Sequence, residues 1–345
     1  MRPLRFHPLT VTRRSDLTDD SVALTLAVPP HLAETFRHLP GQHLTVRHGT
    51  ARRTYSIASP PGAPELTIGV RHIPGGLFSH HVLAAIGPGH TLHVLPPTGR
   101  FTLAPRPGHF AAVTGGSGIT PVLAMATTLL ESEPTARFTL LRAERDAASA
   151  MFIDEVADLK DRHPERFQLL HALSREERHT GPATGRLTEP RLRRLLPALL
   201  PVDRVDGWYL CGPLGLVDAA TTALRTLNVP QGLIHTELFH VKPAPAPPPS
   251  ETPNAATLTA TLDGRRASWP LAPGDTLLTT VLRNRPDAPY ACRGGVCGTC
   301  RARLVSGEVA MDRNFALEPA ELAAGYVLAC QSRPRTPAVE LDFDA

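Results

Sequence analysis

Short runs of alternating hydrophobic and polar residues fill the first third of the chain. Each run has the length and the two-residue period of a β-strand, and turn residues such as Gly and Pro separate the runs. The runs are SVALTLAVP, GQHLTVRH, RTYSIAS, ELTIGVRHI and HTLHVLPP. No long amphipathic pattern interrupts them. We therefore predict an antiparallel β-barrel or a β-sandwich over residues 1–107.

From His109 the pattern changes, because strand-like runs now alternate with segments of helical period. HFAAVT is followed by PVLAMATTLLES, and RFTLLR is followed by AMFIDEVADLKD. The alternation continues through GWYLC and GLVDAATTALRTL. Strands that alternate with helices of this length predict a doubly wound, parallel sheet, which we place at residues 108–241.

A proline-rich segment follows the predicted parallel sheet. Six of the twelve residues in KPAPAPPPSETP (242–253) are proline, which is excluded from helix interiors and favours an extended chain. We predict a semi-rigid linker over residues 242–254. After it, a hairpin turn at Asp263-Gly264 and a short helix in GDTLLTTVLRNR predict a small α+β domain over residues 255–345.

Composition and charge narrow the class of protein. The chain has 345 residues and a formal net charge of +4, and its cations are mostly arginines spread along the sequence. Because no basic cluster or recognition-helix pattern is present, we expect no nucleic-acid partner. The alternative role for the positive charge is docking to an acidic surface of a partner protein. No apolar run is long enough to cross a membrane, and the first residues lack the apolar core of a secretory signal. We expect a cytoplasmic protein with no membrane partner.

Five cysteines are present, and four of them lie close to the C-terminus. Cys292, Cys297 and Cys300 follow the spacing C-x4-C-x2-C, and 29 residues separate Cys300 from Cys330. This spacing matches plant-type 2Fe–2S ferredoxins, whereas zinc ribbons use paired C-x2-C motifs. A zinc site and a thiol–disulfide switch are the alternatives. Cys211 lies far upstream, and we do not expect it to be a ligand.

The segment GGSGITP opens the predicted parallel-sheet domain. Small residues between a strand and a helix leave backbone N–H groups exposed at the helix start, where they bind anions such as a pyrophosphate. We expect Thr120 to be the N-cap of this helix and Pro121 to lie in its first turn. The alternative is a tight turn with no ligand, since the segment departs from G-x-G-x-x-G.

Three further motifs carry candidate chemistry. Arg53-Thr54-Tyr55-Ser56 supplies a cation for a phosphate, a ring that stacks on a planar group, and a hydroxyl. GGLFS follows at residues 75–79, and YLCGP ends a predicted strand at residues 209–213. Taken singly, these motifs are also compatible with an exposed arginine on a strand, a turn, and a buried cysteine before a turn.

In this order and spacing, the motifs over residues 5–240 resemble the ferredoxin–NADP reductase superfamily. The resemblance implies a flavin-binding antiparallel barrel followed by a nicotinamide-nucleotide-binding α/β domain, and the cysteine-rich segment adds a C-terminal β-grasp ferredoxin domain. It implies that Glu237 lies near the flavin, where it would help to handle a proton. It implies that FAD is held by Arg53, Tyr55, Ser56, Gly76, Ser79, Thr120 and Phe239.

The same resemblance implies a site for NADPH in the α/β domain. Arginine beside the third strand favours NADPH, because a guanidinium pairs with the ribose 2′-phosphate. Glu144 departs from the superfamily pattern and brings a carboxylate near this phosphate, so NADH is the alternative. The implied coenzyme residues are Gly115, Gly116, Gly118, Arg145, Ser174, Arg175, Cys211, Gly212 and Pro213.

The domain order implies the partner. A ferredoxin domain after the two reductase domains, together with the segment GEVAMDRNFALEP, resembles the reductase components of multicomponent monooxygenases, including those that serve a di-iron oxygenase acting on an aryl-CoA thioester. NADPH would give a hydride to FAD, and the cluster bound by Cys292, Cys297, Cys300 and Cys330 would pass single electrons to the oxygenase. Reductases of ring- or steroid-hydroxylating oxygenases, a stand-alone diaphorase and an assembly subunit with a structural cluster are the alternatives.

Overall fold

A computed structural model describes residues 5–49, 51–175, 185–239 and 256–345. These residues fall into two compact units, Phe6–Leu238 and the C-terminal part of the chain that follows it. The predicted linker, residues 242–254, lies outside the described residues. Within these residues, no helix has the length and apolar character needed to span a membrane.

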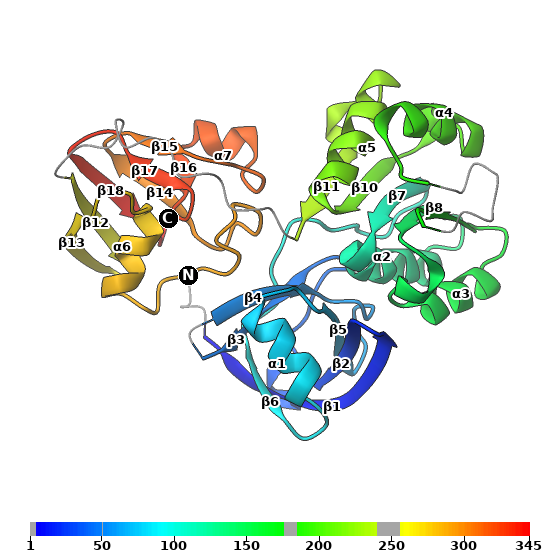
Figure 1. Ribbon diagram of the computed structural model, residues 1–345, viewed down its shortest axis with the longest axis horizontal. Helices are drawn as coiled ribbons and strands as arrows, with labels where there is room; N and C mark the ends of the chain where they lie inside the picture. Colours follow the sequence, from blue (N-terminus) through cyan, green and yellow to red (C-terminus); the bar gives the residue numbers. More distant parts are fainter. Residues whose placement is uncertain (1–4, 50, 176–184, 240–255) are drawn as a thin grey trace. The chain divides into compact units, whose positions relative to one another are not determined.

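The N-terminal part of the first unit is an antiparallel barrel (Figure 1). Its six strands follow the order β4-β3-β6-β1-β2-β5, and an isolated bridge between Ile57 and Ile68 joins the two ends of this order. Alternate side chains fill the interior, among them the fully buried Leu9, Leu24 and Leu44. The strands are β1 (His7–Thr18), β2 (Ser21–Ala27), β3 (His43–His48), β4 (Ala51–Ser56), β5 (Glu65–Arg71) and β6 (Thr91–Val94). The structure confirms the predicted barrel.

Helix α1 (Leu77–Ala85) packs beside β4 and β5 of the barrel. It begins after Gly76, and its C-terminal carbonyl groups accept hydrogen bonds from Arg14 on β1. Cations are favoured at this end of a helix by the unsatisfied carbonyl groups. The arginine therefore ties α1 to the barrel wall.

The second part of the same unit is a five-stranded, fully parallel sheet with the order β11-β10-β7-β8-β9. The chain winds from β7 through β8 to β9 in one direction and places β10 and β11 on the other side. In such sheets ligands bind at the carboxyl ends of the strands where the winding reverses, here between β7 and β10. The strands are β7 (His109–Gly115), β8 (Arg137–Glu144), β9 (Phe167–Leu173), β10 (Gly207–Gly212) and β11 (Ile234–Leu238).

Helices cover both faces of this parallel sheet (Figure 1). Helices α4 and α5 pack against each other, and α5 lies against β10 and β7. The helices are α2 (Ile119–Ser132), α3 (Ile153–Arg162), α4 (Glu189–Leu199) and α5 (Leu214–Thr226). The doubly wound α/β architecture predicted from the alternation is confirmed.

The C-terminal unit contains a mixed sheet with the order β13-β12-β18-β14-β16 and a separate pair, β15-β17. Helix α6 packs on the sheet over a core that includes Leu258, Leu277 and Leu341. At the β12–β13 turn both Asp263 and Gly264 have positive φ, as the predicted two-residue hairpin requires. The elements are β12 (Ala256–Leu262), β13 (Arg265–Leu271), α6 (Leu277–Asn284), β14 (Arg301–Ser306), β15 (Val309–Met311), α7 (Pro319–Ala323), β16 (Tyr326–Leu328), β17 (Ser332–Pro334) and β18 (Ala338–Asp342).

Candidate functional site

Strand β4 carries three of the residues predicted to hold FAD. Arg53 is exposed on this strand and donates through Nη1 to the carbonyl oxygen of Arg52 (2.7 Å). The ring of Tyr55 lies 5.5 Å from that of Phe78 in α1, and burial raises the pKa of the Tyr55 hydroxyl. Ser56 is buried at the end of the strand. The strand therefore presents an exposed cation, an aromatic ring and a hydroxyl, which fits a flavin nucleotide.

The turn before α1 holds Gly76 and Ser79. The Ser79 hydroxyl accepts a hydrogen bond from the N–H of Ile73 (3.1 Å) and donates to the carbonyl oxygen of Gly76 (3.3 Å). A Cβ on Gly76 would lie 2.7 Å from that hydroxyl, so only glycine fits. Ser79 thus shapes the turn, and its contact with a flavin phosphate stays a prediction.

A half-buried carboxylate connects the barrel and the parallel sheet. Oε2 of Glu237 on β11 accepts a hydrogen bond from Ser56 Oγ (3.4 Å), and Oε1 lies 3.8 Å from Nδ1 of His43. His43 and Ser56 are opposite each other on β3 and β4, so their side chains reach the same face. The other imidazole nitrogen, Nε2, lies 3.3 Å from Thr98 Oγ1. The structure thus brings Ser56 and Glu237 together and adds His43 and Thr98, which sequence reasoning missed.

Phe239 follows β11 directly and is half-buried. It groups with the C-terminal unit and not with the barrel. Its role beside the flavin therefore stays a prediction.

The predicted pyrophosphate loop lies at the end of β7, where the winding of the sheet reverses. Gly115 is the last residue of β7, a 3-10 turn covers Gly116–Gly118, and α2 begins at Ile119. The predicted N-cap was wrong: the N-cap is Gly118, and Thr120 lies inside the first turn, where its hydroxyl donates to the carbonyl oxygen of Ser117 (2.9 Å). The 3-10 turn leads directly into α2, so the helix begins without a side-chain cap.

This loop packs directly against the end of β10. A Cβ on Gly118 would overlap the carbonyl group of Cys211, and a Cβ on Gly212 would lie 2.9 Å from the N of Gly115. Cys211 is fully buried, and this burial raises the pKa of its thiol. Pro213 precedes α5 and would touch a Cβ on Gly115 at 3.0 Å. The structure therefore places the two predicted coenzyme motifs side by side at the switch point.

A buried ion pair supports the loop from β8. Nε of Arg142 lies 2.8 Å from Oε1 of Glu144, and the two side chains are 0% and 3% exposed. Burial raises the pKa of Glu144, while Arg142 and the N–H of Gly116 oppose the rise. We expected this carboxylate to lie near the coenzyme phosphate. It is buried against Arg142 and accepts the N–H of Gly116 in the predicted phosphate loop, and its effect on the choice of coenzyme stays a prediction.

The residues predicted to contact the ribose 2′-phosphate meet at the carboxyl ends of β8 and β9. The N–H of Ser174 donates to the carbonyl oxygen of Glu144 (2.9 Å), and the N–H of Arg175 donates to that of Arg145 (2.8 Å). Arg145 and Arg175 are both exposed. Two guanidinium groups on adjacent strand ends can bind a phosphate dianion.

Arg71, at the end of β5, links the barrel to this edge, and it was not predicted from the sequence. Its Nε lies 3.1 Å from Oδ1 of Asp20, and its Nη2 donates to the carbonyl oxygen of Ser149. A Cβ on Gly116 would lie 3.0 Å from its Nη1. No local motif marks Arg71, because its partners lie in three distant segments.

The four cysteines predicted to bind a cluster gather in the C-terminal unit as two thiol pairs. The Cys297 thiol donates to the sulfur of Cys292, which lowers the pKa of Cys292, and the Cys300 thiol does the same for Cys330. Two pairs suit a cluster of two irons, in which each iron takes two thiolates.

Backbone N–H groups of the cluster loop are directed at these sulfurs. The N–H of Gly294 donates to Cys292 Sγ at 3.3 Å, and the N–H of Gly295 reaches Cys330. The Gln331 side chain donates to the carbonyl oxygens of Arg293 and Cys330 (both 3.0 Å), which holds the loop against β16 and its following turn. Donors around sulfur stabilise thiolates that carry iron. The residues therefore fit a 2Fe–2S cluster.

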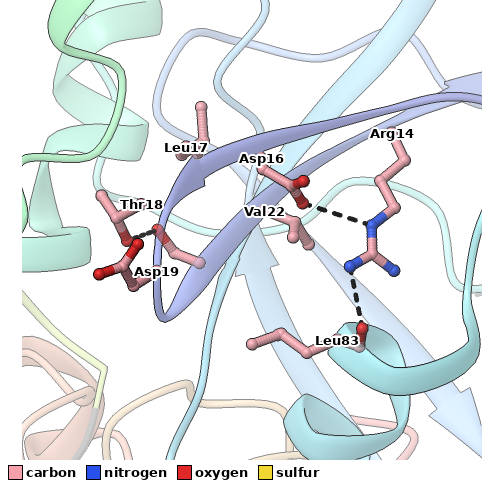
Figure 2. A pocket seen from close by; sticks show the side chains of 8 residues that line it. Arg14, Asp16, Leu17, Thr18, Asp19, Val22 and Leu83 are labelled. Carbon is pink, nitrogen blue, oxygen red and sulfur yellow. Dashed lines mark hydrogen bonds and ion pairs between the residues drawn. The ribbon is translucent and has the colours of Figure 1, made fainter.

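A surface hollow of about 470 Å³ lies between the β1–β2 hairpin and α1 (Figure 2). It is lined by polar side chains, and Arg14 within it donates to the backbone carbonyl groups at the end of α1. None of the predicted site residues lines it. We assign no function to this hollow.

Two family models match the chain. The oxidoreductase NAD-binding domain matches residues 112–222, and the 2Fe-2S iron-sulfur cluster binding domain matches residues 260–335. The first covers the switch-point loop and the end of β10. The second covers all four cluster cysteines.

Two curated relatives match this chain over nearly its whole length. One of the subunits of 1,2-phenylacetyl-CoA epoxidase from Escherichia coli (strain K12) is 41% identical over 352 residues, covering 99% of this chain and 98% of the relative. The ferredoxin reductase component of 3-ketosteroid-9-alpha-monooxygenase from Rhodococcus rhodochrous is 32% identical, with coverage of 97% and 96%.

Solved structures show the same fold. Phthalate dioxygenase reductase matches with a TM-score of 0.61 at 23% identity, covering 98% of each chain. An intact type IV self-sufficient cytochrome P450 monooxygenase matches with a TM-score of 0.73 at 25% identity, covering 97% of this chain and 41% of that longer one.

Proposed function

We propose that this chain, which belongs to the family of ferredoxin reductase components of oxygenases, transfers electrons from NADPH to a di-iron oxygenase acting on phenylacetyl-CoA. Family membership makes it an NAD(P)H-dependent oxidoreductase whose electron acceptor is an oxygenase. The finer proposal rests on one observation, the 41% identity with an epoxidase subunit over 99% of this chain.

The chain's own residues would bind and orient the cofactors. Arg53 and the turn before α1 would bind the FAD phosphates. Tyr55 would stack on the ring system, and Ser56 would donate a hydrogen bond to it. The paired cysteines of the C-terminal unit would hold the 2Fe–2S cluster. When bound, FAD accepts two electrons with a hydride, and the cluster accepts and releases electrons singly.

Glu237 is the group that would handle the proton at this site. It accepts a hydrogen bond from Ser56 and lies beside His43, which Thr98 positions from the opposite side. The carboxylate can therefore hold a proton at Oε2 and exchange it through the Ser56 hydroxyl. His43 and Ser56 are buried and the Glu237 side chain is 13% exposed, so contact of this group with bulk water is limited.

The edge formed by Arg145, Ser174 and Arg175 supports NADPH as the coenzyme. Backbone hydrogen bonds hold these residues together. We expect Arg175→Ala to weaken binding of 2′,5′-ADP by about tenfold and to leave binding of 5′-AMP unchanged. Arg204→Ala, another exposed arginine on the same domain, is the control.

The relay is tested by removing one cluster ligand. In Cys297→Ser we expect loss of the visible iron–sulfur absorbance and of electron delivery to the oxygenase component, while FAD content and NADPH-dependent reduction of ferricyanide persist. The control is Cys211→Ser, in which the iron–sulfur absorbance should be unchanged. Loss of ferricyanide reduction in a folded, FAD-loaded Cys297→Ser protein would contradict the proposed order of transfer.

A steroid hydroxylase is the second candidate partner. It is favoured by the 32% identity with the 3-ketosteroid-9-alpha-monooxygenase reductase component, which extends over 97% of this chain. Reconstitution with each oxygenase distinguishes the two partners. Faster substrate turnover with the steroid enzyme would reject the epoxidase assignment.

A further inference from the structure

A carboxylate of the barrel forms an ion pair with an arginine that is predicted to bind the coenzyme phosphate. Oδ2 of Asp20, in the β1–β2 turn, lies 3.3 Å from Nη2 of Arg145. Its other oxygen, Oδ1, lies 3.1 Å from Nε of Arg71 and 2.8 Å from the hydroxyl of Thr18. The ion pair with Arg145 thus joins the barrel to the end of β8, across 125 positions of sequence.

This carboxylate is held in place independently of Arg145. The carbonyl oxygen of Asp20 accepts the N–H of His72 (2.7 Å), and Arg71 is itself tied to Ser149. Partial burial works against the charged form of Asp20, but Thr18, Arg71 and Arg145 outweigh it and hold the pKa of its carboxyl below the usual range. Asp20 is therefore an anion at neutral pH, anchored beside the arginine.

A 2′-phosphate arriving at Arg145 meets this anion. The guanidinium has a limited set of N–H donors, and two anions that share it repel each other when close. NADH has no 2′-phosphate and leaves the ion pair intact. The carboxylate therefore opposes one coenzyme and not the other.

We propose that Asp20 competes with the 2′-phosphate of NADPH for Arg145 and so limits the preference of this protein for NADPH over NADH. The proposal rests on the NADPH site proposed above. It assigns part of the coenzyme specificity to the flavin-binding barrel, in addition to the nucleotide-binding domain. Arg145 is the phosphate-binding residue, and Asp20 acts through it.

Binding of coenzyme fragments to the FAD-loaded, full-length protein tests this competition. Asp20→Asn keeps the size of the side chain and removes its charge. We expect it to bind 2′,5′-ADP about two- to five-fold more tightly by calorimetry, because ion pairs at this exposure change an equilibrium by that order. Binding of 5′-AMP, which lacks the 2′-phosphate, should be unchanged. The gain should shrink in high salt.

Two controls separate competition from other effects. Asp19→Asn removes the same charge at the neighbouring, exposed position and should leave 2′,5′-ADP binding unchanged. In an Arg145→Gln background the gain from Asp20→Asn should disappear, whereas a general change in folding would persist. Melting temperature and FAD content, measured for each variant, report on folding directly.

The outcomes distinguish the inference from the coenzyme proposal. If Arg175→Ala weakens 2′,5′-ADP binding but Asp20→Asn fails to tighten it, the competition is wrong and the NADPH site stands. If the unmodified protein binds 2′,5′-ADP no better than 5′-AMP and Asp20→Asn does not change this, both are wrong. Equal gains in Asp19→Asn and Asp20→Asn would also overturn the competition, since net charge alone would explain them.

Discussion

The coenzyme loop at Gly115–Gly118 and the cluster loop at Cys292–Cys300 are both rich in glycine, but Gly118 of the first and Gly298 of the second are required for different reasons. In the cluster loop Gly295 and Gly298 have positive φ, at 78° and 69°, so glycine supplies a backbone conformation. Gly118 has an ordinary helical φ of −61°, and glycine is required because Cys211 leaves no space for a Cβ. Gly116 of the coenzyme loop also has a positive φ of 57°, and a Cβ on Gly295 would lie 2.9 Å from the Gln331 side chain, so each loop depends both on its own conformation and on a neighbouring segment.

The two loops also differ in the residues that complete them. The cluster loop would hold the cluster through its own cysteines and nearby N–H groups, and one proposed ligand, Cys330, comes from outside the loop. The coenzyme loop is held by the buried pair Arg142–Glu144 and by the end of β10. A loop whose parts are close in sequence can be identified from spacing, whereas a loop completed by other strands cannot.

The largest effect is expected when the buried support of the coenzyme loop is broken. Glu144→Gln leaves Arg142 as a buried cation without a charged partner, which should lower the free energy of unfolding by about 3–5 kcal/mol. Urea or thermal unfolding of the first unit measures this. The control is Glu131→Gln in the exposed pair with Arg162, with an expected change of at most about 1 kcal/mol. Equal losses would show that the burial of the pair is unimportant.

A smaller loss of stability is expected when a glycine in either loop is replaced by alanine. Gly118→Ala must displace the backbone at Cys211, at a cost of about 1–3 kcal/mol, and should weaken coenzyme binding. Gly298→Ala should cost about 1–2 kcal/mol through its backbone conformation, since the nearest atom would lie 3.7 Å away.

Gly215 in α5 is the matched control for these glycines, because nothing lies within 4 Å of its would-be Cβ. Gly215→Ala should be neutral or stabilise by up to about 1 kcal/mol. Unfolding midpoints and coenzyme titration measure all three variants. A Gly118→Ala protein as stable as Gly215→Ala would disprove the spatial requirement.

The smallest expected effect is a difference in stability between the two units in mild acid. Burial lowers the pKa of His38, His109 and His171 from the ordinary value of 6.5. The folded state then binds fewer protons than the unfolded state, so stability falls as pH drops below 6.5 toward the lowered pKa values. Residues 256–345 contain no histidine, so this loss should be confined to the first unit.

Hydrogen exchange of each unit between pH 7.5 and 5.5 measures this difference. His109→Gln should flatten the response of the first unit, because one of the titrating groups is removed. An equal loss of protection in the C-terminal unit over the same range would contradict the assignment to histidine.

The sequence by itself determined the fold classes of the domains and identified the four cysteines that we propose as cluster ligands. Strand and helix periods are local properties, and Cys292, Cys297 and Cys300 lie within one loop, so their spacing is visible in the chain. Sequence reasoning failed even locally at Thr120, where a 3-10 turn moved the start of α2 and made the cap unnecessary. It also did not find the partner of Glu144, because the buried pair with Arg142 depends on how β8 packs in the sheet.

Only the tertiary structure decided which distant groups meet. Ser56 and Glu237 are separated by 181 positions, and Asp20 and Arg145 by 125, yet each pair is in contact. Barrel closure and the parallel sheet order bring these segments together, because the free energy of burial depends on packing between elements and not on their distance along the chain. The proposed proton-handling group and the proposed competition for the coenzyme phosphate arise from that packing.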